Sequence, residues 1–72
     1  MNRFLKEQTE QGVTVFLFQT LDAQQNTIGF SVVRRVGDKR QETFFPGFPA
    51  AEDFYNSELW DLSYESREKL QY

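Results

Sequence analysis

The stretch Val13-Thr-Val-Phe-Leu-Phe-Gln-Thr20 decides the fold. Its residues are almost all β-branched or aromatic, a composition that predicts a β-strand. One face of this strand carries Val13, Val15 and Leu17, and the other carries Thr14, Phe16 and Phe18. Because both faces are largely apolar, we expect an internal strand, or one whose second face is covered by something else. Left uncovered, the second face would promote aggregation.

A hairpin is predicted to follow this strand. Residues 22–26 are polar and indicate a loop, and residues 27–36 alternate as a half-buried strand with Ile28, Phe30 and Val32 on its apolar face. Gly37-Asp38 is a Gly-X pair typical of a type II′ turn, so residues 39–45 form the returning strand. The turn fixes the expected pairs as Val36 with Lys39, Arg35 with Arg40, Val33 with Glu42 and Phe30 with Phe45. The last pair adds two rings to the core, which supports this register.

The rest of the chain predicts one helix and leaves one segment ambiguous. Pro46 and Pro49 end the last strand because proline has no amide donor, and residues 50–70 then favour a helix, with a break near Asn56-Ser57 left open. Its core-facing arc would hold Ala51, Tyr55, Leu59, Leu62 and Leu70. Residues 2–10 fit either a short helix or a further strand. We therefore expect a single domain over residues 1–72 with an α+β fold, a small antiparallel meander of three to four strands packed against a C-terminal helix.

The composition of the chain excludes several classes of chemistry but does not identify a function. The 72 residues include neither histidine nor cysteine and carry a net charge of −3. The commonest general base, the commonest metal ligands and thiolate chemistry are therefore missing. We expect no enzymatic activity, no catalytic residues, no metal site and no cofactor. No export signal or apolar span is recognisable, so a cytoplasmic location without membrane association is expected.

Acidic residues are concentrated in the last third of the chain. Residues 46–72 hold six acidic and two basic groups, whereas residues 1–45 hold five acidic and six basic groups. Four of the acids would share an arc of about 80° on the helix: Glu58, Asp61, Glu65 and Glu68. The favoured interpretation is a solvated helix face, and the alternative is a negative stripe that binds a basic surface of a partner.

Aromatic residues outside the predicted core supply the other partner-binding candidates. Trp60 and Tyr64 lie on a third arc of the helix, where an interface would use them, although burial is favoured for the only tryptophan. Phe44 and Phe48 lie in a proline-constrained segment and either plug the end of the sheet or form a rigid apolar knob.

Basic residues cluster around the predicted hairpin turn, at Arg34, Arg35, Lys39 and Arg40. Arg35 faces Arg40 in the expected register, a like-charge pair that Glu42, the acidic helix or a partner must offset. Charges at a strand end also discourage edge-to-edge aggregation. Nucleic-acid binding requires aromatic rings on the same face, and Phe44 meets this condition only loosely.

These features favour a small non-catalytic protein-interaction module that binds and modulates or inhibits a cytosolic partner protein, in the manner of a phage-type or accessory regulator. One alternative is a homodimeric structural or assembly protein that uses the second face of strand 13–20. The other is nucleic-acid binding through the basic hairpin 34–40, which the net negative charge disfavours.

Overall fold

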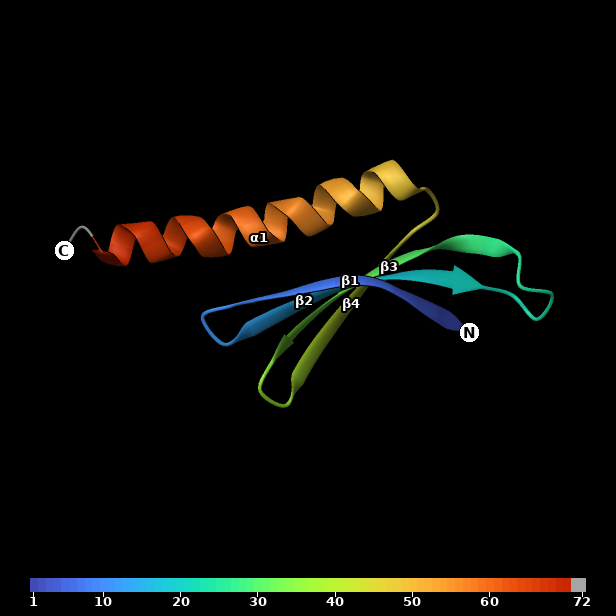
Figure 1. Ribbon diagram of the computed structural model, residues 1–72, viewed down its shortest axis with the longest axis horizontal. Coiled ribbons are helices and arrows are strands. Elements are labelled where there is room, and N and C mark those ends of the chain that lie inside the picture. Colours follow the sequence, from blue (N-terminus) through green and yellow to red (C-terminus); the bar gives the residue numbers. More distant parts are fainter. Residues whose placement is uncertain (71–72) are drawn as a thin grey trace.

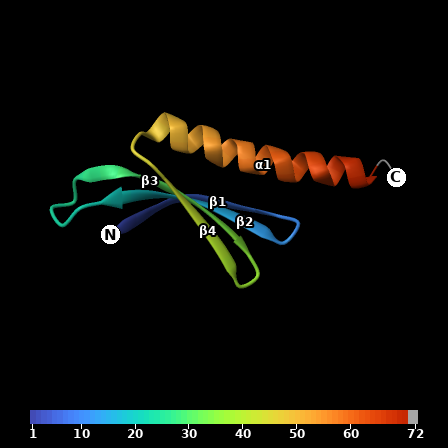
Figure 2. The ribbon, with the colours of Figure 1, turned by 180° about the vertical axis from the view of Figure 1, so that it is seen from behind.

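The computed structural model describes the backbone of residues 1–70 and the side chains of residues 1–60. It consists of four strands and one helix: β1 (Asn2–Glu10), β2 (Val13–Leu21), β3 (Thr27–Val36), β4 (Lys39–Phe45) and α1 (Phe48–Leu70). The strands form one antiparallel sheet in the order β1-β2-β3-β4, and α1 lies across one face of it (Figures 1 and 2). The expected α+β meander is confirmed, with four strands.

The ambiguous residues 2–10 form an edge strand. The turn that follows decides this, because Gln11 and Gly12 have φ angles of 51° and 79°. Positive φ at both central residues is the requirement of a type I′ turn, whose twist matches that of a two-stranded hairpin. The β1–β2 register shifts once, between Phe4 and Lys6, at a bulge.

The hairpin of β3 and β4 has the expected register. Val36 pairs with Lys39, Arg35 with Arg40, Val33 with Glu42 and Phe30 with Phe45. Gly37 has a φ of 58°, the positive value that a type II′ turn needs at its first central position. The strand over residues 13–21 is internal, as its two apolar faces require.

The core lies between the sheet and α1. Its buried members are Val13, Val15, Leu17, Val32, Ala51 and Tyr55, with Phe30, Phe45, Phe54 and Leu59 packed around them. The helix is continuous through Asn56 and Ser57, and it begins at Phe48, two residues before the predicted start. Leu62 and Leu70, which were also expected in this core, lie outside the residues whose side chains are described.

One core prediction is wrong. Ile28 is 52% exposed, whereas Ser31 and Val33 on the opposite face of β3 are each only 2% exposed. The cause is a shift in the β2–β3 register between Thr20 and Leu21, which leaves Ile28 without a paired residue near the start of the strand. Simple alternation does not place a residue at such an irregularity.

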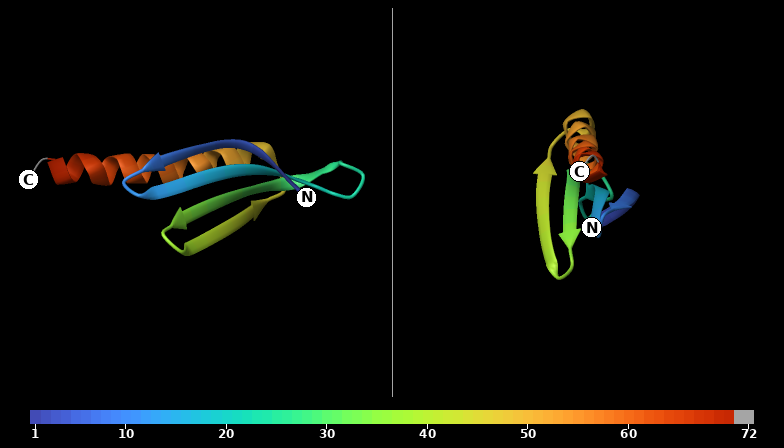
Figure 3. Two further views of the ribbon diagram at one scale, coloured as in Figure 1. Left: turned by 60° about the horizontal axis from the view of Figure 1, so that its bottom comes forward. Right: turned by 90° about the vertical axis from the view of Figure 1, so that its left-hand side faces the viewer.

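The second face of the sheet is not covered by α1. The view in the left panel of Figure 3 places the strands in front of the helix, and the end-on view shows two layers, one of strands and one of helix. We call this uncovered side the open face. Within the described part of the chain, no helix is long and apolar enough to cross a membrane.

Candidate binding surface

Aromatic rings gather on the open face. Phe16 and Phe18, two residues apart on β2, lie with ring centroids 5.8 Å apart and planes only 21° from parallel. Phe4 of β1 meets Phe18 edge to face at 6.1 Å. Phe16 and Phe18 are half-buried, and Phe4 is 53% exposed. The two central rings therefore form a nearly parallel pair on a sheet surface that no other element of residues 1–70 covers.

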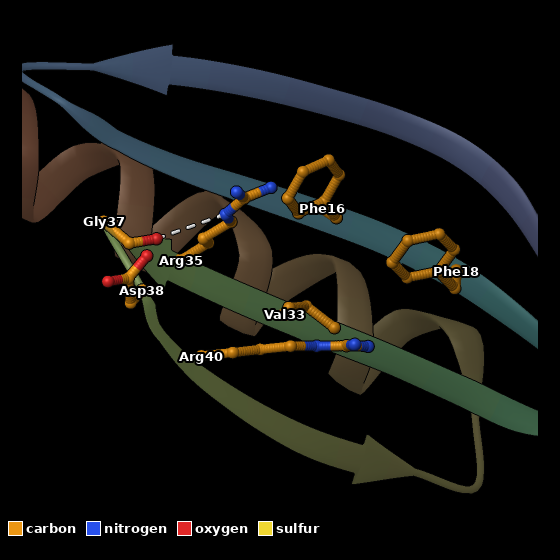
Figure 4. Close-up of a pocket in the computed structure, with 7 residues that line it drawn as sticks. All are labelled: Phe16, Phe18, Val33, Arg35, Gly37, Asp38 and Arg40. Carbon is orange, nitrogen blue, oxygen red and sulfur yellow. Dashed lines mark hydrogen bonds between the residues drawn. The ribbon is translucent and has the colours of Figure 1, made fainter.

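A hollow with a volume of about 420 Å³ lies beside these rings at the turn end of the β3–β4 hairpin. It is lined by Phe16, Phe18, Val33, Arg35, Gly37, Asp38 and Arg40 (Figure 4). The floor is the buried Val33, and the side chain of Arg40 lies beside it. Rings therefore form one side of the hollow, and two guanidinium groups lie next to them.

The charges around the hollow are unevenly neutralised. Arg40 Nη2 lies 3.1 Å from Glu42 Oε2, which partly offsets the repulsion between the directly paired Arg35 and Arg40. Arg35 Nε donates to the carbonyl oxygen of Gly37 at 3.3 Å. No carboxylate of a described residue lies within ion-pair distance of Arg35. The hollow thus holds a guanidinium group, that of Arg35, which makes no direct ion pair with a described residue, although Asp38 lines the same hollow.

The four basic residues predicted as one patch are divided between the two faces of the hairpin. Arg35 and Arg40 lie on the open face, whereas register places Arg34 and Lys39 on the side of α1. Arg34 Nη1 donates to Glu58 Oε2 at 3.3 Å. Glu58 is therefore half-buried and ion-paired, and it does not belong to a fully solvated acidic face. Asp61, Glu65 and Glu68 lie outside the described side chains.

The aromatic residues predicted to bind a partner also lie on different faces of the molecule. Phe44 is 52% exposed on the open face, whereas Phe48 contacts Phe30 on the helix side, with ring centroids 5.2 Å apart. The expectation that Trp60 is buried is wrong, since it is 61% exposed. Trp60 follows Leu59, which packs against the core, and one helical residue turns by about 100°, so the indole leaves the packed side. Tyr64 lies outside the described side chains.

Phe4 was not predicted as a binding residue, and the face that carries Phe16 and Phe18 was predicted to bind only a second copy of the chain. Alternation along residues 13–20 puts Phe16 and Phe18 on one face, and the hairpin turn puts Arg35 opposite Arg40. What alternation could not supply is the β2–β3 register, which pairs Phe16 with Val33 and brings the two sets together. In the loop 22–26, Asp22 Oδ1 accepts from the backbone N–H groups of Gln24 and Asn26, and the polar composition of this loop did not reveal the register across it.

The chemistry available at this surface is that of recognition. Guanidinium groups donate to phosphate or carboxylate oxygens, and flat rings stack on other flat groups. Among the described residues, no group of three histidine, cysteine or acidic side chains is placed to hold a metal ion.

Comparisons of the chain with protein-family models, with curated proteins and with solved structures give no significant match.

Proposed function

We propose that this protein is a small non-catalytic binding module that binds nucleic acid through the open face of its sheet. One observation carries the proposal: Phe16, Phe18, Arg35 and Arg40 line the same hollow. Interleaved rings and cations are the combination that nucleic-acid binding uses, because phosphates need positive charge and bases need flat apolar partners. The cytoplasmic location expected from the sequence belongs to the same proposal.

The net charge of −3 is compatible with this function because of where the acids lie. Six of the eleven acidic residues follow residue 45, in the segment that forms α1, which packs on the other face of the sheet. Of the four basic residues of the β3–β4 hairpin, Arg35 and Arg40 lie on the open face, whereas Arg34 and Lys39 lie on the side of α1. Charge that acts within about 10 Å governs binding at physiological salt, so the position of these two guanidinium groups matters more than the net charge of the whole chain.

The proposal is tested by fluorescence anisotropy with labelled mixed-sequence oligonucleotides, single-stranded and duplex, at low salt. Arg35→Gln should weaken binding about tenfold, the equivalent of one charge-assisted hydrogen bond of about 1.5 kcal/mol. Lys39→Gln is the matched control, since it removes the same charge from the opposite face of the same hairpin. Absence of binding to either form of nucleic acid, or an equal loss in both variants, would contradict the proposal.

A protein-interaction module, with a regulatory or inhibitory role, is the second candidate. The observation that favours it is Trp60, 61% exposed beside a shallow hollow formed with Asp53, Asn56 and Ser57 on the outer side of α1. Exposed tryptophan is a frequent interface anchor. The test is affinity capture from nuclease-treated lysate, in which a stoichiometric protein should be retained by the wild type and lost from Trp60→Ala. Equal capture by both proteins contradicts this role for Trp60.

A further inference from the structure

We propose that the open face selects single-stranded nucleic acid, with phosphates over the row that holds Arg35 and Arg40 and bases over the neighbouring rings of Phe16 and Phe18. This inference rests on the proposed function, and it adds the form of nucleic acid and its path. The argument comes from the cross-strand register, which arranges the side chains of the open face in rows that run across the sheet.

The first row consists of hydrogen-bond donors. Thr9 pairs with Thr14, Thr14 with Arg35 and Arg35 with Arg40, so all four lie on one line across the four strands. The hydroxyl groups of Thr9 and Thr14 are 2.9 Å apart and hydrogen-bonded to each other. Hydroxyl and guanidinium groups are common phosphate ligands, and no carboxylate belongs to this row. We call it the phosphate row.

The second row differs from the phosphate row because its end residues are acidic. Glu7 pairs with Phe16, Phe16 with Val33 and Val33 with Glu42, so an acidic residue on each edge strand ends the row and apolar side chains lie between. The Glu42 carboxylate repels a phosphate backbone, whereas the central ring accepts a base. A backbone that crosses the sheet is therefore directed to the phosphate row.

The third row continues the apolar surface. It holds Phe4, Phe18, Ser31 and Phe44, in that order across the strands. Residues two apart along a strand are separated by about 7 Å. This is the scale of one nucleotide from phosphate to base, so a strand with its phosphates on the first row places a base over Phe16, and the ring of Phe18 extends the apolar surface beyond it.

The rings of Phe16 and Phe18 explain why the nucleic acid must be single-stranded. A base stacks on such a ring only when its own face is free, and in a duplex each base face is already covered by its neighbours. A duplex has no free base face to stack on these rings, so it would contact only the phosphate row. Stacking is worth about 1–3 kcal/mol per base, which is roughly a tenfold or greater preference for the unpaired strand.

Glu42 lowers the affinity of the phosphate row for a phosphate group. Its carboxylate holds Arg40 at 3.1 Å in the unbound protein and competes with a phosphate for the same guanidinium. Glu42→Gln removes this competitor and should raise affinity several-fold. It should also steepen the dependence of log K on log salt by about 0.7, the contribution of one extra phosphate contact on a single strand.

The test measures binding of the full chain to a labelled single strand of ten or so nucleotides, and to the same strand annealed to its complement, over about 50 to 200 mM salt. Three results are expected. The single strand binds at least about tenfold tighter. Phe16→Leu lowers that preference and leaves the salt slope unchanged. Arg35→Gln makes the slope about 0.7 shallower and leaves the preference unchanged. Lys39→Gln, on the other face, alters neither quantity by a comparable amount.

The possible failures are distinguishable. Equal affinity for both forms, or an unchanged preference in Phe16→Leu, overturns this inference but leaves nucleic-acid binding standing. Binding to neither form overturns both proposals. If Phe16→Leu is not folded by circular dichroism, Phe4→Leu tests base stacking at a ring that is 53% exposed and less important for packing. Sedimentation that shows a wild-type dimer, dissociated by Phe18→Asp, would assign the open face to a second copy and overturn both proposals.

Discussion

The ring of Phe44 occupies the space that a side chain at position 29 would need. A Cβ built on Gly29 would overlap this ring and would stand 2.7 Å from the carbonyl oxygen of Phe45. The ring of Phe44 therefore packs against the backbone of Gly29 on the neighbouring strand. The consequence is that glycine is required at position 29 for reasons of space, since its φ lies outside the left-handed region.

Gly29→Ala should destabilise the protein by about 1–3 kcal/mol, the usual effect of overpacking. The reason is that a ring and a backbone carbonyl must both move. Urea denaturation measures the change. Gly47→Ala is the control, because the only atom near its added Cβ is Pro49 Cδ at 3.9 Å. Equal effects of the two substitutions would contradict the steric explanation.

Gly12→Ala should also destabilise the protein, for a different reason. Nothing lies within 4 Å of the added Cβ, but the φ of 79° is unfavourable for any L side chain. We expect a loss of about 1 kcal/mol in the free energy of unfolding. Gly12→Asn should lose less, because asparagine tolerates a left-handed backbone better than alanine does. Identical losses for alanine and asparagine would argue against a backbone origin.

The Arg34–Glu58 pair should couple β3 to α1 by about 0.5–1 kcal/mol. Its atoms are 3.3 Å apart, and the two side chains are 41% and 19% exposed. A double-mutant cycle with Arg34→Gln and Glu58→Gln isolates the coupling. Because the pair is partly exposed, the coupling should shrink as salt is added. Additive effects of the two substitutions at low salt would show that the pair contributes nothing.

Tyr55 should make the protein sensitive to alkali. Burial raises the pKa of its hydroxyl above the usual value of about 10, and the Glu7 carboxylate raises that pKa further. The unfolded chain therefore ionises first, so stability is complete below about pH 10 and falls as the pH rises beyond it. Tyr55→Phe should flatten this alkaline loss in urea titrations at several pH values. An unchanged alkaline slope would assign the effect to other groups.

Local patterns predicted the elements that have strong local signals. The Gly37-Asp38 turn predicted four residue pairs of the β3–β4 hairpin, and alternation placed Val13, Val15 and Leu17 on one face, which the structure shows to be the core face. The sequence did not decide between helix and strand for residues 2–10. These residues are mostly exposed, so no regular spacing of buried apolar side chains distinguishes the two.

The candidate surface depended on information that is not local. The exposure of Trp60 and the ion pair of Glu58 follow from how α1 is rotated over the sheet, which the helix sequence alone does not specify. The meeting of Phe16 with Arg35 depends on the β2–β3 register. Alternation assigned Phe16 and Phe18 to one face correctly, but it could not tell which residues of the neighbouring strand would lie beside them.

The order of the elements has a consequence for biosynthesis. Every strand pairs with its neighbour in the chain, so the sheet can assemble while the ribosome is still translating, whereas the helix that covers Val15 and Leu17 is made last. A chain that ends at Pro46 would therefore expose apolar side chains on both faces of the sheet, Val15 and Leu17 on one and Phe16 and Phe18 on the other. Until α1 packs on the sheet, the polypeptide is most exposed to chaperones and to proteolysis.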